Sequence, residues 1–166
     1  MPLILRRLLV ALSFVAGLAA AQEAPLATGP HACRIAFDMG SSGIRAGASD
    51  SERSARRELD ALGPLWAGQG IASIEPAVIR ALRELPAEAA LDDKCRKVGG
   101  GFSAWRLALE QDPAGLVASL RRIDAAAGVT VLVMPPAREG SYGFFAVHQT
   151  LGRRFATSHA LDIGAI

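Results

Sequence analysis

A turn near residue 40 combines the residue types that bind phosphate and metal ions. It follows the apolar run 35–37 and leads into a second, alternating apolar run over residues 44–48. Its members are an acid, two glycines and two serines: Asp38, Gly40, Ser41, Ser42 and Gly43. Glycines let backbone N–H groups approach an anion, serine hydroxyls add donors, and a carboxylate can hold a hydrated divalent cation against phosphate. The pattern predicts a β-hairpin whose turn is either a phosphate-binding loop or an ordinary Gly/Ser turn.

The same order of residue types returns near the end of the chain. Residues 160–165 (ALDIGA) repeat the pattern of residues 36–41 (AFDMGS), in which an apolar run ends in an acid before a glycine. Two strand-to-loop units of one design predict a pseudo-symmetric site in which two loops hold one phosphate chain. A six-residue echo also arises by chance, so the repeat supports the phosphate-binding interpretation without deciding it.

Hydrophobic periodicity and turn residues predict the elements that position these turns. The expected strands cover residues 34–38, 43–49, 96–101, 129–134 and 158–163, and residues 54–60 form either a third antiparallel strand or a helix. The expected helices cover 76–85, where Pro86 interrupts, a segment capped by Ser103, 114–127 and 138–154, with a loop over 63–70. Trp66 and Trp105 are expected to be packing residues, and the apolar run 129–134 a buried parallel strand. An antiparallel hairpin followed by parallel strands and helices predicts an α/β fold, a single ribonuclease-H-like lobe.

Two cysteines, Cys33 and Cys95, each stand just before an expected strand. If those strands are parallel neighbours, both thiols lie at the same end of the sheet, within reach of a disulfide. A disulfide suits an oxidising compartment. The alternative is two unrelated buried thiols.

The first 21 residues have the pattern of a secretory signal peptide. Arg6 and Arg7 precede an apolar run of 14 residues that ends in Ala19, Ala20 and Ala21. This run is shorter than the ~18–20 residues of a membrane-spanning helix, although a retained anchor is the alternative. We therefore expect cleavage after Ala21, a periplasmic or secreted protein and no membrane attachment afterwards.

Composition and missing motifs exclude several classes of function. The signal peptide holds two arginines and no acid, so its removal takes the formal net charge from +2 to zero, which argues against nucleic-acid binding. The chain has no G-x-S-x-G motif of a serine hydrolase and no Walker-type phosphate loop. The three histidines lie far apart, without the spacing of zinc ligands: His31, His148 and His159.

Four motifs, taken together in chain order, indicate a resemblance to a known family. They are DMGSSGIR (38–45), GGFSAWRLA (100–108), REGSYGFFAVHQTLG (138–152) and ALDIGA (160–165). Together they resemble the N-terminal lobe of the Ppx/GppA family of exopolyphosphatases and guanosine-pentaphosphate phosphohydrolases, over roughly residues 34–164. They are also similar to the conserved regions of the ecto-apyrases (nucleoside triphosphate diphosphohydrolases). Both families belong to the actin/Hsp70/sugar-kinase superfamily, so the resemblance implies an actin-like ATPase lobe.

The resemblance also implies roles for particular residues. It places Asp38 and Asp162 near a divalent cation, Mg²⁺ or Ca²⁺, and makes Glu139 the residue that orients or deprotonates the attacking water. It implies phosphate contacts from Gly40, Ser41, Ser42, Gly43, Arg45, Arg106 and Gly164. Such a set suits phosphoanhydride hydrolysis, which needs cradled phosphates, a metal and one carboxylate aimed at water. The alternatives are a solvated acid in the first turn of a helix for Glu139 and a surface arginine for Arg106.

The chain also departs from the family pattern. Phe102 stands where these families usually have Thr, Arg138 precedes a single acid, and Pro135-Pro136 replaces a Ser-Gly-like turn. We expect a signal peptide over 1–21, a leader over 22–32, a lobe over 33–157 and the truncated start of a second lobe over 158–166.

Two hypotheses follow. One is an exported, metal-dependent phosphoanhydride hydrolase of Ppx/GppA or apyrase type, acting on polyphosphate or nucleoside polyphosphates. The other is a catalytically incomplete lobe that binds a phosphate ligand, a partner chain carrying the second lobe, or a second copy of itself.

Overall fold

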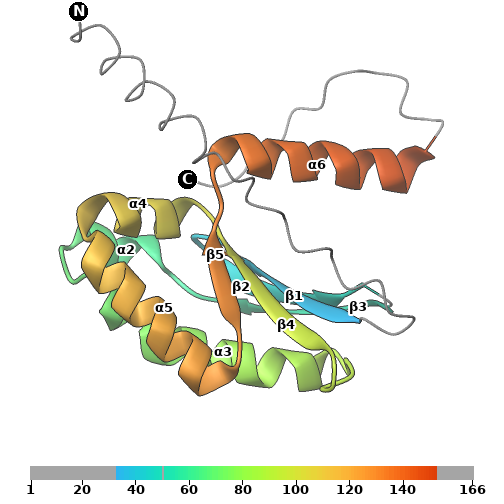
Figure 1. Ribbon diagram of the computed structural model, residues 1–166, viewed down its shortest axis with the longest axis horizontal. Helices are drawn as coiled ribbons and strands as arrows, with labels where there is room; N and C mark the ends of the chain where they lie inside the picture. The colour runs from blue at the N-terminus through green and yellow to red at the C-terminus, as the bar shows by residue number, and fades with distance from the viewer. Residues whose placement is uncertain (1–32, 50, 153–166) are drawn as a thin grey trace, which may run out of the picture. The chain divides into compact units, whose positions relative to one another are not determined.

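A five-stranded sheet in the order β3-β2-β1-β4-β5 organises the computed structural model, which describes residues 33–49 and 51–152 (Figure 1). The strands are β1 (Arg34–Met39), β2 (Gly43–Ala48), β3 (Ser51–Glu58), β4 (Arg96–Gly101) and β5 (Thr130–Val133). Strand β2 pairs antiparallel with β1 and with β3, whereas β1, β4 and β5 are parallel. The predicted α/β lobe, with its hairpin first and its parallel strands after, is confirmed.

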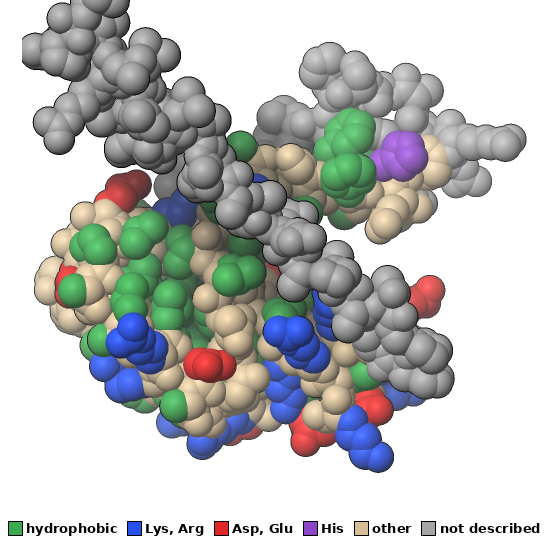
Figure 2. Space-filling model, viewed as in Figure 1, with side chains coloured by type: hydrophobic (Ala, Val, Ile, Leu, Met, Phe, Trp, Pro, Cys, Tyr) green, Lys and Arg blue, Asp and Glu red, His purple; other side chains and the backbone are tan. Residues whose placement is uncertain are grey.

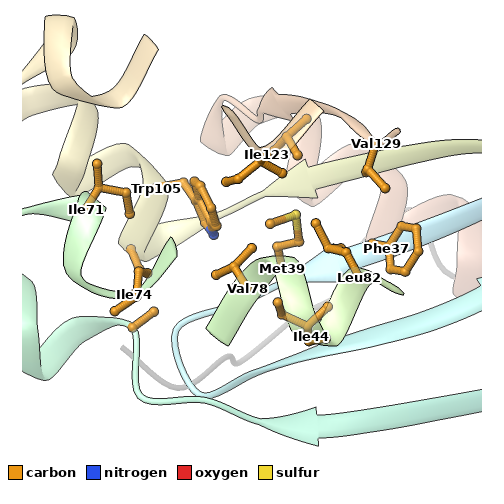
Figure 3. Packing of buried hydrophobic residues seen from close by; sticks show 14 of the residues in the cluster. Phe37, Met39, Ile44, Ile71, Ile74, Val78, Leu82, Trp105, Ile123 and Val129 are labelled. Carbon is orange, nitrogen blue, oxygen red and sulfur yellow. The ribbon is translucent and has the colours of Figure 1, made fainter. Parts of the chain in front are cut away.

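Helices supply the apolar cover for one face of this sheet. The helical elements are α2 (Leu62–Trp66), the 3-10 turn η1 (Ile71–Ser73), α3 (Glu75–Glu88), α4 (Ser103–Gln111), α5 (Pro113–Ala127) and α6 (Pro136–Leu151). Helices α3, α4 and α5 contact the strands and supply this cover, whereas α6 does not cover that face (Figure 1). Strand β1 shows how side chains alternate, because Phe37 and Met39 are buried while Asp38 between them is exposed. Figure 3 shows Phe37 and Met39 packed with Val78 and Leu82 of α3. No helix in the described ranges combines the length and the apolar character that a membrane span requires.

The opposite face of the sheet keeps exposed side chains. Asp38 of β1, Arg45 of β2 and Arg56 of β3 are exposed on it, and so is Leu132 of β5, whose relative exposure is 60%. Strand β5 is parallel to β4 as predicted, but it is not buried throughout, because the described helices cover only the side of β5 that carries Val131. The sheet therefore has one apolar face covered by helices and one face with exposed side chains.

The structure decides one open alternative and corrects two local expectations. Residues 54–60, which suited a strand or a helix, lie mainly in β3, because β2 offers an unpaired edge. Helix α2 occupies part of the expected loop 63–70, and the Asp60 side chain accepts hydrogen bonds from the N–H groups of Leu62 and Gly63, at 3.1 and 2.8 Å. Helix α3 continues through Pro86, which is buried against the core, so packing compensates for the hydrogen bond that proline cannot donate.

Two expectations about single side chains are also settled. Ser103 is the first residue of α4 and not its cap, since Phe102 holds the N-cap position without a side-chain hydrogen bond. Trp105 is a core residue with 1% exposure, as predicted, but Trp66 is 66% exposed and does not pack in the core. The aromatic ring of Trp105 lies so close to β4 that a Cβ on Gly101 would stand 2.7 Å from its Cγ. A glycine is therefore required where the strand leads into α4.

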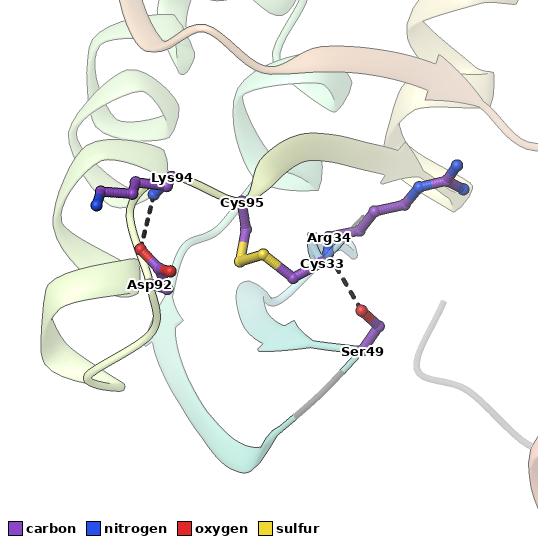
Figure 4. Close-up of a disulfide and its surroundings, with 6 residues drawn as sticks. All are labelled: Cys33, Arg34, Ser49, Asp92, Lys94 and Cys95. Carbon is purple, nitrogen blue, oxygen red and sulfur yellow. Dashed lines mark hydrogen bonds between the residues drawn. A yellow bond between two sulfur atoms is a disulfide. The ribbon is translucent and has the colours of Figure 1, made fainter. Parts of the chain in front are cut away.

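A disulfide joins Cys33 and Cys95 at the amino ends of β1 and β4 (Figure 4). The two Cα atoms are 4.9 Å apart, and the N–H of Arg96 donates to the carbonyl of Cys33 at 3.2 Å. Neighbouring hydrogen bonds join Arg34 N to Ser49 Oγ at 3.1 Å and Lys94 N to Asp92 Oδ1 at 3.0 Å. The parallel pair thus begins at a covalent link.

An ion pair between Glu75 and Arg122 fastens α3 to α5. Arg122 donates from Nε and Nη2 to the Glu75 carboxylate at 2.8 to 3.0 Å. These hydrogen bonds, chiefly, hold the pKa of Glu75 below its ordinary value. A carboxylate with a lowered folded pKa stabilises the fold above the unfolded pKa and loses that contribution as the pH falls through the folded pKa.

We expect Glu75→Gln to lower the melting temperature by a few degrees at pH 7. The difference from the unmodified chain should shrink as the pH falls from about 4.5 through the lowered pKa of the folded state, because the carboxylate then becomes protonated in both states. Thermal unfolding followed by circular dichroism between pH 7 and pH 2.5 measures this. Glu110→Gln is the matched control, since Glu110 is exposed and has no ion pair among the residues of the structure. An equal loss at every pH would contradict the prediction.

Candidate functional site

The predicted phosphate turn joins β1 to β2 at the carboxyl ends of the parallel strands. Strands β1, β4 and β5 end at this edge, and backbone hydrogen bonds link it: Phe102 N donates to Met39 O at 3.2 Å and Met134 N to Gly101 O at 2.8 Å. In open α/β sheets, ligands bind outside the carboxyl ends of the strands. The topology alone therefore makes this edge the candidate site.

The turn is fixed by its own backbone and by the segment that follows β3. Gly40 N donates to Gly43 O at 3.0 Å, which closes the turn. Leu59 N and Ala61 N donate to the carbonyls of Ser42 and Ser41, at 3.2 and 2.9 Å. These bonds hold the turn from the outside, so its position does not depend on a ligand.

Glycine is needed at the end of the turn because β3 passes close by. A Cβ on Gly43 would stand 2.6 Å from the carbonyl oxygen of Arg57. Ser41 is 7% exposed and Ser42 is exposed, so the hydroxyl of Ser42 is the more accessible of the two. Arg56 Nη2 donates to Ser42 Oγ at 3.5 Å.

A row of charged residues crosses the open face of the sheet beside the turn. The strand register places Asp38 opposite Arg45 and Arg45 opposite Arg56. Residues directly opposite one another on antiparallel strands share a face of the sheet. The positively charged side chains of Arg45 and Arg56 thus lie beside the turn, as phosphate binding requires. They lie next to Asp38, an acid that can hold a metal ion.

Arg106 and Glu139 contact each other. Arg106 Nη1 donates to Glu139 Oε2 at 2.7 Å and to the carbonyl of Met134 at 3.0 Å. Arg106 comes from α4, and Glu139 from the first turn of α6. The predicted water-activating acid and the predicted phosphate contact are therefore partners in an ion pair, and Arg106 fixes the position of the carboxylate.

One cavity of about 570 Å³ brings most of these residues together. Its lining includes the turn 40–43 and the side chains of Asp38, Arg45, Arg56, Phe102, Glu139 and Tyr142. Arg106 does not line the cavity and reaches it through Glu139. The described part of α6 carries exposed apolar side chains, Tyr142, Phe145 and Leu151, and hydrophobic atoms are visible on α6 in Figure 2. The structure thus gathers the predicted residues of the first loop and of the third motif.

The chemistry of this cavity fits a divalent cation. Asp38 and Glu139 both line this cavity, and Mg²⁺ is typically bound by one or two carboxylates together with water and substrate phosphates. Asp162 and Gly164, predicted for the second phosphate loop, lie outside the described residues. A group formed by Cys33, Asp92 and Cys95 is not a thiolate site, because its sulfur atoms form the disulfide.

Arg56 is the charged residue of the cavity lining that the sequence did not reveal. It stands in the segment whose secondary structure was ambiguous, next to a second arginine, so no pattern distinguishes it. Only the register of β3 against β2 places it opposite Arg45. The alternation of side chains along β3 would place Arg56 on the open face, but only once the segment is known to be a strand.

No protein-family model matches the chain, and no curated protein is similar to it at a significant level. Solved structures do match. A type II variant of the Aquifex aeolicus Ppx/GppA phosphatase superposes with a TM-score of 0.57 at 19% identity, over 73% of this chain and 41% of that one. A second crystal structure of an Aquifex aeolicus member of the Ppx/GppA protein family gives a TM-score of 0.56 at 21% identity, over 72% and 40%. The chain thus shares the fold of part of these proteins and spans about two fifths of their length.

Proposed function

We propose that this chain is the phosphate-binding lobe of a metal-dependent phosphoanhydride hydrolase that acts on polyphosphate or nucleoside polyphosphates. The observation that carries the proposal is the single cavity that the turn 40–43 shares with Asp38, Arg45 and Glu139. The fold shared with Ppx/GppA phosphatases supports it. The motif DMGSSGIR favours an apyrase-like nucleotide substrate as the narrower alternative.

In this proposal each residue has one task. Backbone N–H groups of the turn, the Ser42 hydroxyl and Arg45 bind the phosphate oxygens, and Asp38 would hold the Mg²⁺ or Ca²⁺ ion. When bound, such an ion takes up the negative charge that develops on the phosphates. Glu139 orients a water molecule and accepts its proton as the water oxygen attacks the terminal phosphorus. The anhydride P–O bond breaks, and its electrons leave with the shortened phosphate chain.

Arg106 acts as a positioning residue in the same scheme. Its guanidinium holds Glu139 Oε2 at 2.7 Å while the Met134 carbonyl fixes the guanidinium itself. Charge-assisted hydrogen bonds of this kind restrict the orientation of a carboxylate. The other carboxylate oxygen can then face the water.

We also propose that a second lobe completes the site. The matched Ppx/GppA structures are more than twice as long as the segment that superposes. Residues 158–166, with Asp162 and Gly164, would begin the opposite wall, which a further segment, a partner chain or a second copy supplies. The rival function is a lobe that binds phosphate without turnover, and the ion pair that occupies Glu139 is the observation in its favour.

Export to an oxidising compartment completes the proposal. The Cys33–Cys95 disulfide supports a periplasmic or secreted location, because such bonds persist where thiols are not kept reduced. N-terminal sequencing of the protein recovered from the periplasm or medium of an expressing bacterium tests it. A mature chain that begins at Gln22 is expected, and retention of residues 1–21 in the membrane fraction would contradict it.

Phosphate release by the purified chain tests the hydrolase. Polyphosphate, ATP and ADP are offered with Mg²⁺ or Ca²⁺, and the oligomeric state is measured in the same buffer. If a second copy supplies the opposite wall, the self-associated chain should release phosphate, and EDTA should abolish that release and added cation restore it. A folded, self-associated chain that releases no phosphate with either cation would favour the binding lobe instead.

A further inference from the structure

Two arginines stand directly opposite each other beside the phosphate turn. Arg45 of β2 and Arg56 of β3 are register partners, both are exposed, and both line the cavity of about 570 Å³. Directly opposite like charges destabilise an antiparallel pair. Asp38, the register partner of Arg45 on β1, and Glu58, which pairs with Arg56, offset part of this repulsion in the free protein. An anion between the two guanidinium groups would offset it further.

The surroundings of Arg56 leave its guanidinium available to a ligand. Nη2 contacts Glu58 Oε1 at 3.2 Å and Ser42 Oγ at 3.5 Å, and both acceptors are exposed. Within residues 33–49 and 51–152, Nε and Nη1 of Arg56 form no hydrogen bond. An ion pair exposed to solvent is weak, so Glu58 is a modest competitor for an incoming phosphate.

Arg57, the next residue of β3, has a structural role that contrasts with that of Arg56. Arg57 points to the other face of β3, where Glu84 and Glu88 of α3 both accept hydrogen bonds from it. Neighbouring residues of a strand face opposite sides of the sheet. Arg57 is therefore fixed to a helix, whereas Arg56 faces the cavity.

We propose that Arg45 and Arg56 form a subsite for a second phosphoryl group, next to the one held by the turn 40–43. The contact between Arg56 and Ser42 makes the two subsites adjacent. Two guanidinium groups can each bind phosphate oxygens in a bidentate manner. The site then selects ligands with at least two linked phosphates over orthophosphate and over phosphate monoesters. This inference rests on the proposed function, because it assigns the turn to phosphate.

Binding in the absence of turnover tests the subsite. Orthophosphate, pyrophosphate and tripolyphosphate are titrated calorimetrically into the full chain in EDTA, with orthophosphate measured by competition against tripolyphosphate. The variants are Arg56→Gln and, as a control with the same charge change, Arg53→Gln. Arg53 is an exposed residue of β3 that does not line the cavity. Thermal unfolding is measured for both variants to check that they are folded.

We expect the unmodified chain to bind tripolyphosphate at least tenfold more tightly than orthophosphate. Arg56→Gln should weaken tripolyphosphate binding by about tenfold to a hundredfold, the usual effect of a charged hydrogen bond. It should leave orthophosphate binding within about twofold, and Arg53→Gln should change neither.

Three results would overturn the subsite. The first is an equal loss of tripolyphosphate affinity in Arg56→Gln and Arg53→Gln. The second is an equal loss of orthophosphate and tripolyphosphate affinity in Arg56→Gln. The third is an unmodified chain that does not prefer tripolyphosphate over orthophosphate or binds neither. Failure of the hydrolase proposal is distinguishable, because a chain that binds tripolyphosphate through Arg56 but releases no phosphate retains the subsite and loses the activity.

Discussion

Replacing Glu139 by Gln should lower phosphate release from polyphosphate about 100-fold to 10,000-fold, the usual contribution of a general base. Gln keeps the size and one oxygen of the side chain, so the hydrogen bond from Arg106 and the start of α6 should remain. What it removes is the ability to accept a proton from water. The loss should therefore appear in kcat, with KM changed little.

The assay compares initial rates with Mg²⁺ for the unmodified chain and for Glu139→Gln and Glu110→Gln. Glu110 lies in α4, away from the cavity lining, so its variant should keep full activity. Tripolyphosphate binding in EDTA should be preserved in both variants. A Glu139→Gln chain that hydrolyses polyphosphate within a few fold of the unmodified rate would remove Glu139 from the mechanism and leave the binding cavity in place.

Replacing both Cys33 and Cys95 by Ala should lower the free energy of unfolding by about 4 kcal/mol. The two cysteines are 62 residues apart, so the bond closes a long loop and restricts the unfolded chain strongly. With a urea m-value of about 2 kcal/mol per molar, the midpoint should fall by about 2 M. The bond also lies at the edge of the apolar core, where Cys95 is buried.

Urea unfolding of the oxidised chain, the reduced chain and the double variant measures this. Reduction should lower the midpoint of the unmodified chain to that of the variant, and the reductant should leave the variant unchanged. Coincident curves for the oxidised and reduced chains would mean that the hydrogen-bonded parallel pair β1–β4 holds the sheet end without the covalent link.

Local sequence patterns were sufficient for most of the fold. The alternating hairpin and the apolar run near residue 130 identify strands by themselves, and Gly128 ends α5 in the left-handed conformation, as a C-cap glycine should. The pattern failed where non-local pairing or packing decides. Strand β3 forms because β2 offers it an edge, and the exposure of Trp66 depends on how α2 lies on the lobe.

The residues of the candidate site also divide into those that local sequence predicts and those that depend on non-local contacts. Asp38, the turn 40–43 and Arg45 are contiguous in sequence, so one motif could predict them together. Glu139 and Arg106 come from separate helices, and no sequence pattern predicts their ion pair, because it depends on how α4 and α6 lie relative to each other. Arg56 was missed for a physical reason, since the side that a strand residue faces depends on register with a neighbour.

The alternation along β1, β2 and β3 separates the side chains that pack in the core from those on the open face. Phe37 and Met39 maintain the core, whereas Asp38, Arg45 and Arg56 face the ligand side of the same strands. Mutations on the open face should therefore change the chemistry of the proposed phosphate site with little effect on packing. A library that randomises positions 36, 45, 47, 54 and 56 should contain mostly folded members, so the proposed site could be varied without loss of the fold.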